Sequence, residues 1–311
     1  MIVIGERDIE RNTELVAGIG FFDGVHLGHR SLIDRIVTTG RELNLSSAVI
    51  TFSNHPREVL SENQCPLLLT TYEERMEKLA ETGLDYCISL PFTKELSEFS
   101  ARKFLDLLAS HYGVRCLYVG YDHRFGHDRN EGFDAYKAYG KELGISVVKA
   151  EPYEPDGMHV SSSVIRRLLE EGNINQANRL LSYPYGLWGK VVEGYRIGRK
   201  IGFPTANIVP LNAHKIIPAS GVYAVKVKIG DTLYGGMLNI GTRPTVHPDA
   251  PRNIEVHIFG YSGNLYGENI GILFLAFLRP ERKMSDISEL SLQLEKDREQ
   301  AKALLSSDRF C

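Results

Sequence analysis

Hydrophobic and polar residues alternate in two different ways along this chain of 311 residues. In the first half, short apolar runs typical of buried strands are followed by segments with apolar residues at helical spacing. The strand-like runs are residues 14–19, 47–52, 86–90, 116–120 and 145–150, and the helical segments between them are residues 29–44, 72–82, 100–112 and 132–143. Strands that alternate with helices indicate βαβ units and a parallel sheet, with ligands at the carboxyl ends of the strands.

The pattern changes near residue 185, after a last helical segment at residues 173–181. Short β-branched runs separated by Gly, Pro, Asn and Asp follow at residues 188–193, 222–229, 232–239, 253–259 and 269–278. They predict an antiparallel barrel or sandwich, with a tight hairpin turn at residues 229–232. A closing helix is predicted to pack on the barrel through Ile287, Leu290, Leu294, Ala301 and Leu304.

These patterns predict two domains, residues 1–184 and 185–311, each long enough to enclose a core. We expect residues 185–311 to fold alone. A net charge of -3 argues against a nucleic-acid partner. The four cysteines are far apart and form no C-x-x-C, so we expect reduced thiols. No apolar run reaches the ~18 residues of a membrane span, and a cytoplasmic protein without a membrane partner is expected.

The most informative motif follows the first predicted strand. Residues 20–30 read GFFDGVHLGHR, which places His26 and His29 at a helix entrance, with Gly28 between them. Helix N-termini attract phosphate, and imidazoles there can stabilise charge that develops during phosphoryl or nucleotidyl transfer. An H-x-x-H pair can also ligate zinc, but no third ligand occurs at metalloprotease spacing. A structural role for one histidine alone is the other alternative.

A second motif, residues 160–169, reads VSSSVIRRLL. Serines before an apolar helical pattern are N-cap signals, which is the simpler interpretation. Arg166 lies one turn beyond Ser162 and Ser163, so hydroxyls, amides and a guanidinium can converge on one polyphosphate. Alone, this motif is weak evidence for a polyphosphate site, and together with H-x-G-H it is strong evidence.

A third motif, GRKIGFPTAN at residues 198–207, combines glycines, two cations, a rigid proline and small polar side chains. Glycines let a backbone approach phosphates, and Thr205 and Asn207 offer neutral oxygens to Mg²⁺. Its composition alone equally fits a loop between strands. No P-loop sequence occurs. Two phosphate-handling motifs on one chain suggest two consecutive reactions.

With these motifs the chain resembles the prokaryotic bifunctional riboflavin kinase/FAD synthetases. The resemblance also rests on TFSNHP (51–56), GYDHRFG (120–126), NIGTRPT (239–245), EVH (255–257) and FLRPERK (277–283), all in family order. It implies a Rossmann-like H-x-G-H nucleotidyltransferase domain at residues 1–184. It also implies a mainly antiparallel β-barrel riboflavin kinase domain with a terminal helix at residues 185–311.

The resemblance implies that riboflavin and ATP give FMN and ADP, and that FMN and ATP then give FAD and pyrophosphate, both with Mg²⁺. In the adenylyltransferase half it implies that His26 and His29 bind ATP phosphates and stabilise the transition state. The nucleotide contacts that it implies there are Gly20, Phe21, Asp23, Gly28, Asp122, Ser162, Ser163 and Arg166.

In the kinase half the resemblance implies that Glu255 is the general base for the ribityl hydroxyl, and that Thr205 and Asn207 hold the metal. From the residues alone, Glu255 alternates with Ile254 and Val256 as a solvent-facing strand residue would. The implied nucleotide contacts are Gly198, Lys200, Gly202, Pro204, Thr205 and Asn207, and the implied flavin contacts of the chain are Asn54, His55 and Arg279.

Three positions depart from the family pattern: Asn54, His123 and His159. They concern the flavin pocket more than the reaction. Two other functions stay open from the sequence. One is a riboflavin kinase whose nucleotidyltransferase half is inactive or accepts another phosphate, and the other is a flavin- or nucleotide-binding regulator without turnover.

Overall fold

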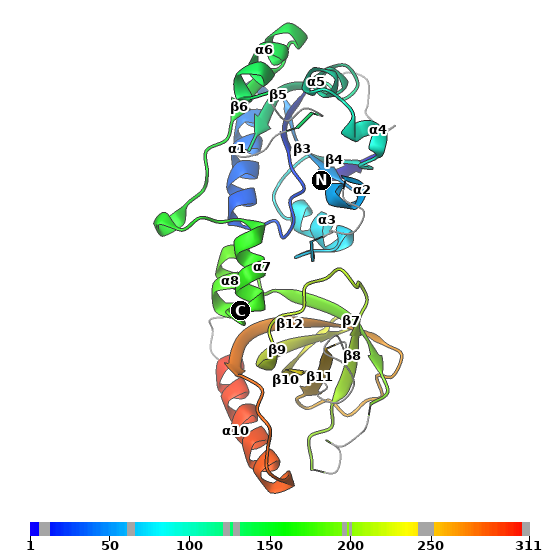
Figure 1. Ribbon diagram of the computed structural model, residues 1–311, viewed down its shortest axis with the longest axis vertical. Helices are drawn as coiled ribbons and strands as arrows, with labels where there is room; N and C mark the ends of the chain where they lie inside the picture. Colours follow the sequence, from blue (N-terminus) through cyan, green and yellow to red (C-terminus); the bar gives the residue numbers. More distant parts are fainter. Residues whose placement is uncertain are drawn as a thin grey trace. The chain divides into compact units, whose positions relative to one another are not determined.

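A computed structural model describes residues 1–5, 13–60, 66–120, 125–126, 131–194, 198, 201–241 and 252–306 (Figure 1). The chain forms two compact units, Met1–Ser162 and Ser163–Cys311, and each is described by itself. The predicted fold class, an α/β sheet followed by an antiparallel barrel with a terminal helix, is confirmed.

The described part of the first unit contains a six-stranded parallel sheet with the order β1-β4-β3-β2-β5-β6. Its strands are β1 Ile2–Ile4, β2 Leu15–Ile19, β3 Ser46–Phe52, β4 Tyr86–Leu90, β5 Val114–Val119 and β6 Ser146–Lys149. Its helices are α1 Leu27–Leu43, α2 Pro56–Leu60, α3 Tyr72–Ala80, α4 Lys94–Ser97, α5 Ala101–Ser110 and α6 Phe133–Leu143, with a 3₁₀ turn η1 at Pro155–Gly157.

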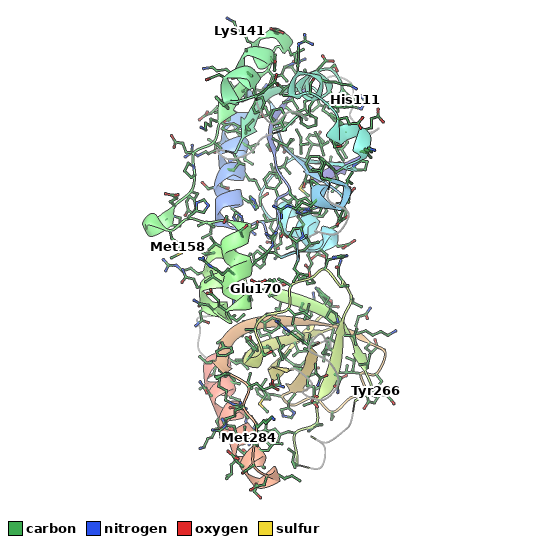
Figure 2. All side chains as sticks on the ribbon, viewed as in Figure 1. His111, Lys141, Met158, Glu170, Tyr266 and Met284 are labelled. Atoms are coloured by element: carbon green, nitrogen blue, oxygen red, sulfur yellow. The ribbon has the colours of Figure 1, made fainter. Side chains whose placement is uncertain are left out.

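Both faces of this sheet are covered, which is why its strands are apolar almost throughout. Alternate residues of β2 enter different cores, with Ala17 on the side of α5 and Val16 on the side of α1 and α3. The side chains in Figure 2 fill the space between the sheet and these helices. Three short elements, β1, α2 and α4, were not predicted, because three to five residues are too few to show a period.

The second unit contains a closed barrel with the strand order β10-β11-β8-β7-β12-β9, paired antiparallel throughout. The strands are β7 Gly186–Val192, β8 Ala206–Pro210, β9 Gly221–Ile229, β10 Thr232–Gly241, β11 Asn253–Ile258 and β12 Asn269–Arg279. The predicted hairpin is confirmed, because Ile229 pairs with Thr232 across Gly230, whose φ is +55°. β8 was not predicted as a strand, because it begins in a motif whose composition equally fits a loop. Its pairing with β7 and β11 makes it part of the barrel.

Helix α10, Ile287–Leu305, closes the unit and packs on the outer face of the barrel. Leu294, Ala301 and Leu304 join a core with Met237, as predicted. Ile287 does not follow the prediction, because 67% of its surface is exposed at the start of the helix. None of the helices in the described part of the chain combines the length and the apolar character that a membrane crossing requires.

Two further helices, α7 Ser162–Glu170 and α8 Ile174–Leu181, pack with the barrel unit. The side-chain amide of Asn178 donates to the carbonyl of Phe274 on β12 and accepts from the N–H of Tyr185. Leu169 accepts a hydrogen bond from the N–H of Ala219. The division between the compact units therefore lies near residue 162, whereas a domain boundary at residue 184 stays a prediction.

This packing predicts that a fragment of residues 163–311 is more stable than one of residues 185–311. The shorter fragment lacks several fully buried apolar side chains, among them Leu169, Ile174, Leu180 and Leu181, each of which contributes about 1.5–3 kcal/mol when buried. Denaturant unfolding followed by circular dichroism should show a higher midpoint for the longer fragment. Equal midpoints would show that α7 and α8 add nothing to the barrel.

Candidate active sites

The first site is the turn between β2 and α1, at the carboxyl end of the parallel sheet (Figure 1). β2 ends at Ile19 and α1 begins at Leu27, so H-x-G-H stands at a helix N-terminus. The side chain of His26 caps this helix by accepting a 3.3 Å hydrogen bond from the backbone N–H of His29. The other first-turn amides and the helix dipole make this place suitable for phosphate.

The two imidazoles of the turn stack on each other. Their ring centroids are 3.7 Å apart, and the His29 ring also meets the ring of Phe22 at 5.2 Å. Burial, and then the charge of Arg75, lower the pKa of His29 to about 3. His29 is therefore neutral near pH 7, with one ring N–H to donate. Among the described residues its buried Nδ1 has no hydrogen-bond partner, so the turn holds a polar atom that a ligand can satisfy.

Asp23 fixes the shape of this turn. Its buried carboxylate accepts hydrogen bonds from the backbone N–H of Leu69 at 3.0 Å, the backbone N–H of Thr70 at 2.9 Å and the Thr70 hydroxyl at 3.0 Å. The Thr70 hydroxyl in turn accepts from the N–H of Gly24 at 2.9 Å. The carboxylate is thus engaged by the chain's own donors, and a direct contact of Asp23 with nucleotide stays a prediction.

Gly28 lies in a tightly packed part of the turn. A Cβ at this position would lie 3.2 Å from the His26 ring and 3.3 Å from the carbonyl oxygen of Val160. Gly20 continues the end of β2, where its N–H donates to the carbonyl of Ile50 at 3.0 Å. Gly28 therefore leaves room for the His26 ring, and the contacts of Gly20 and Gly28 with nucleotide stay predictions.

The serine motif reaches the same turn through its second serine. The hydroxyl of Ser162 donates to the backbone carbonyl of Asp23 at 3.0 Å. Ser163 and Arg166 follow on the first two turns of α7, where Ser163 is exposed. They belong to the second compact unit. Asp122, His123 and His127 lie outside the described residues.

The two predicted flavin contacts of this unit follow β3. The amide of Asn54 bonds both backbone groups of Phe92, donating at 3.0 Å and accepting at 2.8 Å, so it extends the β3–β4 ladder. His55 accepts from the N–H of Arg57 at 3.1 Å, and its ring meets Phe21 at 4.6 Å. The pair of His55 and Phe21 presents an aromatic surface, whereas Asn54 is engaged within the protein.

The second site lies on the outer face of the barrel, where three adjacent strands align polar side chains. The register places Asn207 of β8 and Asn239 of β10 on either side of Glu255 of β11. Residues paired in this way share one face of a sheet. Ile254 and Val256 are fully buried, so the intervening Glu255 points away from the barrel interior.

Two side chains orient the carboxylate of Glu255. Its Oε2 accepts from the Thr205 hydroxyl at 3.1 Å, and its Oε1 accepts from the Asn253 amide at 2.5 Å. His257, on the same face of β11, lies with its Nδ1 2.8 Å from the carbonyl oxygen of Pro204. An ionised carboxylate has about four acceptor positions, so two such contacts leave room for a substrate hydroxyl.

The glycines of the third motif form the turn before Pro204. The carbonyl of Gly198 accepts from the N–H groups of Ile201 and Phe203 at 3.2 and 2.9 Å. A Cβ at Gly198 would lie 2.1 Å from the Phe203 carbonyl oxygen. Gly202 has a φ of +81°, in the left-handed region that favours glycine. Lys200 lies outside the described residues.

A cavity of about 300 Å³ lies beside Glu255, at the lower end of the range for small-molecule sites. Its apolar walls come from the third motif, the barrel and α10, and they include Ile201, Phe203, Val222, Met237, Leu290 and Leu294. Its polar lining includes Thr205, Asn239, Glu255, His257, Arg279 and Glu281. The cavity thus combines an apolar chamber with a cluster of oxygen atoms at one side.

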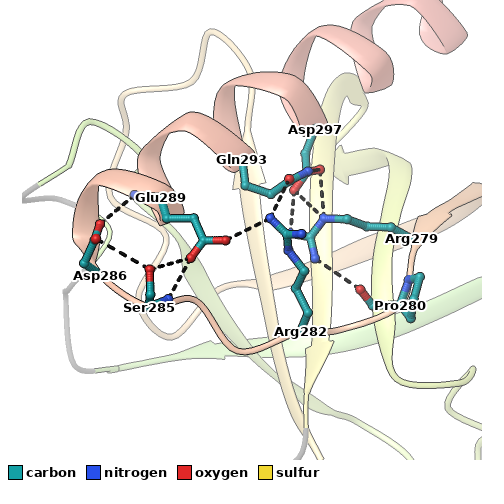
Figure 3. A network of polar contacts seen from close by, with 8 residues as sticks. All are labelled: Arg279, Pro280, Arg282, Ser285, Asp286, Glu289, Gln293 and Asp297. Atoms are coloured by element: carbon teal, nitrogen blue, oxygen red, sulfur yellow. Dashed lines mark hydrogen bonds and ion pairs between the residues drawn. The ribbon is translucent and has the colours of Figure 1, made fainter.

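Arg279, predicted as a flavin contact, anchors α10 to β12 (Figure 3). Its Nε and terminal nitrogen hold the Asp297 carboxylate at 2.9 and 2.7 Å, and Asp297 is only 1% exposed. Gln293 also donates to this carboxylate, at 2.8 Å. Arg282 pairs with Glu289 in the first turn of the helix. The network holds one wall of the cavity, and direct flavin binding by Arg279 stays a prediction.

Comparison with known proteins identifies the family. Residues 8–164 match FAD synthetase, and residues 181–305 match riboflavin kinase. The bifunctional riboflavin kinase/FMN adenylyltransferase of Escherichia coli K12 is 37% identical over 284 residues, which cover 91% of this chain and 90% of that protein. The protein of the same name from Listeria monocytogenes is 38% identical, with coverage of 94% and 92%. This chain belongs to the bifunctional riboflavin kinase/FMN adenylyltransferase family.

A solved structure has the same fold. The crystal structure described as that of a macrolide-efflux protein from Streptococcus pneumoniae matches with a TM-score of 0.87 and 30% identity, covering 97% of this chain and 99% of that one. The family assignment confirms the two predicted activities: the protein is a riboflavin kinase and an FMN adenylyltransferase that makes FMN and FAD. The FAD synthetase match includes the H-x-G-H turn, and the riboflavin kinase match includes Glu255.

Four residues that shape these two sites were not predicted. Asn253 and Asn239 flank the carboxylate of Glu255, and the period of two along β11, with the register to β10, was the signal that could have found them. Gly194 and Arg75 act through close contacts between segments far apart in sequence. No local pattern marks such contacts.

Gly194 leads to a prediction for the kinase site. The nearly buried amide of Asn207 fills the space beside this glycine, and a Cβ at Gly194 would lie 2.0 Å from its Nδ2. Gly194→Ala should therefore displace Asn207 and lower FMN formation by about 10-fold or more, since a misplacement of 1 Å can cost 10²-fold. Gly260→Ala is a control outside the site, where a Cβ meets nothing within 4 Å although φ is +69°. Native kinase rates in Gly194→Ala would contradict the prediction.

Proposed function

We propose that riboflavin is phosphorylated in the site that contains Glu255 and that FMN is adenylylated in the site formed by the H-x-G-H turn. The observation that supports this most directly is the carboxylate of Glu255, oriented by Thr205 and Asn253 beside a cavity with apolar walls. Such a cavity suits a flavin ring, and a carboxylate at its polar side suits the hydroxyl of the ribityl chain.

In the kinase reaction, Glu255 takes the proton of the ribityl hydroxyl as its oxygen attacks the γ-phosphorus of ATP. The new P–O bond forms while the bond to the β-phosphate oxygen breaks, and ADP leaves. The Thr205 hydroxyl donates a 3.1 Å hydrogen bond to the Glu255 carboxylate, so the proton acceptor and the phosphate-binding segment keep a fixed geometry. Positioning of this kind can contribute several kcal/mol to the barrier.

Mg²⁺ is proposed at the same site, held by the oxygens of Thr205 and Asn207 together with the substrate phosphates. Hydroxyl, amide and carboxylate oxygens are the ligands that this ion prefers. The described residues contain no group of three or more His, Cys, Asp and Glu side chains that could hold a metal. A metal held mainly by substrate phosphates fits this donor set, and when bound it neutralises the charge that develops during transfer.

In the adenylyltransferase reaction, a phosphate oxygen of FMN attacks the α-phosphorus of ATP and pyrophosphate leaves. An ionised phosphate needs no general base, so the site has only to bind and orient charge. The first-turn amides of α1 and the N–H groups of His26 and His29 are proposed to donate to the phosphates. Ser162, Ser163 and Arg166 are proposed to hold the β- and γ-phosphates, and His55 to contact the flavin.

One experiment tests the assignment of the reactions and the metal. Purified protein is incubated with riboflavin and ATP, with Mg²⁺ or with excess EDTA, and the flavins are separated over time. FAD is expected with Mg²⁺, after transient FMN, and neither product with EDTA. Accumulation of FMN alone would support an inactive nucleotidyltransferase half. Product formation in EDTA would contradict the proposed role of Mg²⁺. A cytoplasmic location is proposed because both reactions consume ATP.

A further inference from the structure

Arg75 is a buried cation that contacts the backbone of the H-x-G-H turn. It lies on α3 and is only 1% exposed. Its guanidinium donates to the carbonyl oxygen of Phe21 at 3.0 Å and to that of Phe52 at 2.5 Å. These two carbonyls follow β2 and end β3, so a single side chain joins the carboxyl ends of two adjacent strands. The guanidinium also lies 4.0 Å from the centroid of the Phe21 ring.

Arg75 and Asp23 form a reciprocal clamp. Asp23, in the turn, bonds the backbone of Leu69 and Thr70 just before α3. Arg75, on α3, bonds the backbone of Phe21 in the turn. Both charged groups are buried, and their charges attract each other. The turn after β2 therefore supplies a carboxylate to the backbone before α3, and α3 supplies a guanidinium to the backbone of the turn. Together these contacts fix both segments more firmly than either contact alone.

The turn needs such a clamp because its backbone is strained. Phe22 and Val25 have φ values of +57° and +37°, which residues other than glycine rarely adopt. Residues in such conformations persist only where the surrounding structure determines them, and they concentrate at functional sites. If the turn relaxed, the cap made by His26 and the position of His29 would change together, since both lie within four residues of Val25.

We propose that Arg75 is a positioning residue for FMN adenylylation, which holds the H-x-G-H turn in the conformation that binds the phosphates of ATP. It acts through the carbonyls of Phe21 and Phe52 and does not itself touch the nucleotide. The planar fork of arginine reaches both carbonyls at once, whereas a lysine ammonium at the end of a flexible chain does not.

The test uses Arg75→Met and Arg75→Lys in the full chain. FAD formation from supplied FMN is measured against ATP concentration, and riboflavin phosphorylation is measured on the same preparations. Arg75→Met should lower kcat for FAD by about 10²-fold and raise the KM for ATP several-fold, because displaced phosphate donors weaken both binding and orientation. Arg75→Lys should show the same pattern with a smaller loss. The kinase rate should stay native in both variants.

The change in KM separates positioning from simple loss of folded protein. A partly unfolded preparation contains fewer active molecules, which lowers the apparent kcat at an unchanged KM. Arg102→Met removes an exposed arginine of α5 that forms an ion pair with the exposed Glu142, and it should leave both constants native. An unchanged KM for ATP in both Arg75 variants would overturn the proposal.

A second variant keeps the test informative if Arg75→Met does not fold. Thr70→Val removes the hydroxyl that links Asp23 to the N–H of Gly24 and preserves the shape of the side chain. It weakens the other half of the clamp without removing a charge. The proposal expects a raised KM for ATP here too, by a smaller factor, and a native KM in Thr70→Val and Arg75→Lys would refute it.

Discussion

Replacement of Glu255 by glutamine is expected to lower riboflavin phosphorylation by about 10²–10⁴-fold, the usual effect of losing a general base. The amide keeps the shape of the side chain and cannot accept the proton. Its oxygen can still accept from Asn253, and its NH₂ can donate to the Thr205 hydroxyl, so both contacts of the native carboxylate survive. The loss therefore reports basicity and charge, with little contribution from local unfolding.

The same variant should keep its affinity for riboflavin, because a base interacts with the hydroxyl mainly in the transition state. FAD formation from added FMN should also stay native, since the H-x-G-H turn lies in the other compact unit. Paired rates of FMN and FAD formation on one preparation provide the measurement. Glu268→Gln, at an exposed position before β12, is the matched control. A kinase rate within a few-fold of native would mean that the base lies elsewhere, with His257 the next candidate.

The fold could be predicted because each layer leaves a period in the sequence. The helix α5 places Phe104, Leu105 and Leu108 in one core, and the strands of the parallel sheet are apolar because both of their faces are covered. The segment of β8 could not be predicted in this way. Its first residues, Ala206 and Asn207, follow a turn-forming proline, and only pairing with two other strands makes them part of the barrel.

The sites could be predicted only in their motif residues. His26 and His29 lie together because three positions separate them on one helix turn, and the structure brings Thr205 and Glu255, from two separate motifs, into one hydrogen bond. Asp23 and Asn54 look from sequence like ligand contacts. Their polar atoms bond the chain's own backbone, because in both cases a distant segment supplies donors that a local pattern does not show.

His29→Ala is expected to lower FAD formation from FMN by about 10²–10³-fold, as the loss of a preorganised donor usually does, and to leave riboflavin phosphorylation native. His29→Asn retains an N–H donor near the position of Nδ1 and should lose less. His111→Ala is the control, because this exposed histidine lies at the end of α5 in the same unit (Figure 2). FAD synthesis at the native rate in His29→Ala would remove His29 from the site.

The pKa of His29 adds a second and independent readout. Its value of about 3 in the folded protein lies below the ordinary 6.5, so between these values the unfolded chain binds one more proton than the folded chain. His29 therefore contributes its full stability above pH 6.5 and loses it as the pH falls toward 3, with a slope of up to about 1.4 kcal/mol per pH unit.

His29→Asn should reduce the loss of unfolding free energy over this range. If native protein and His29→Asn lose stability equally between pH 6.5 and 4, His29 is hydrated and charged in the folded state, and the donor in the turn is an imidazolium.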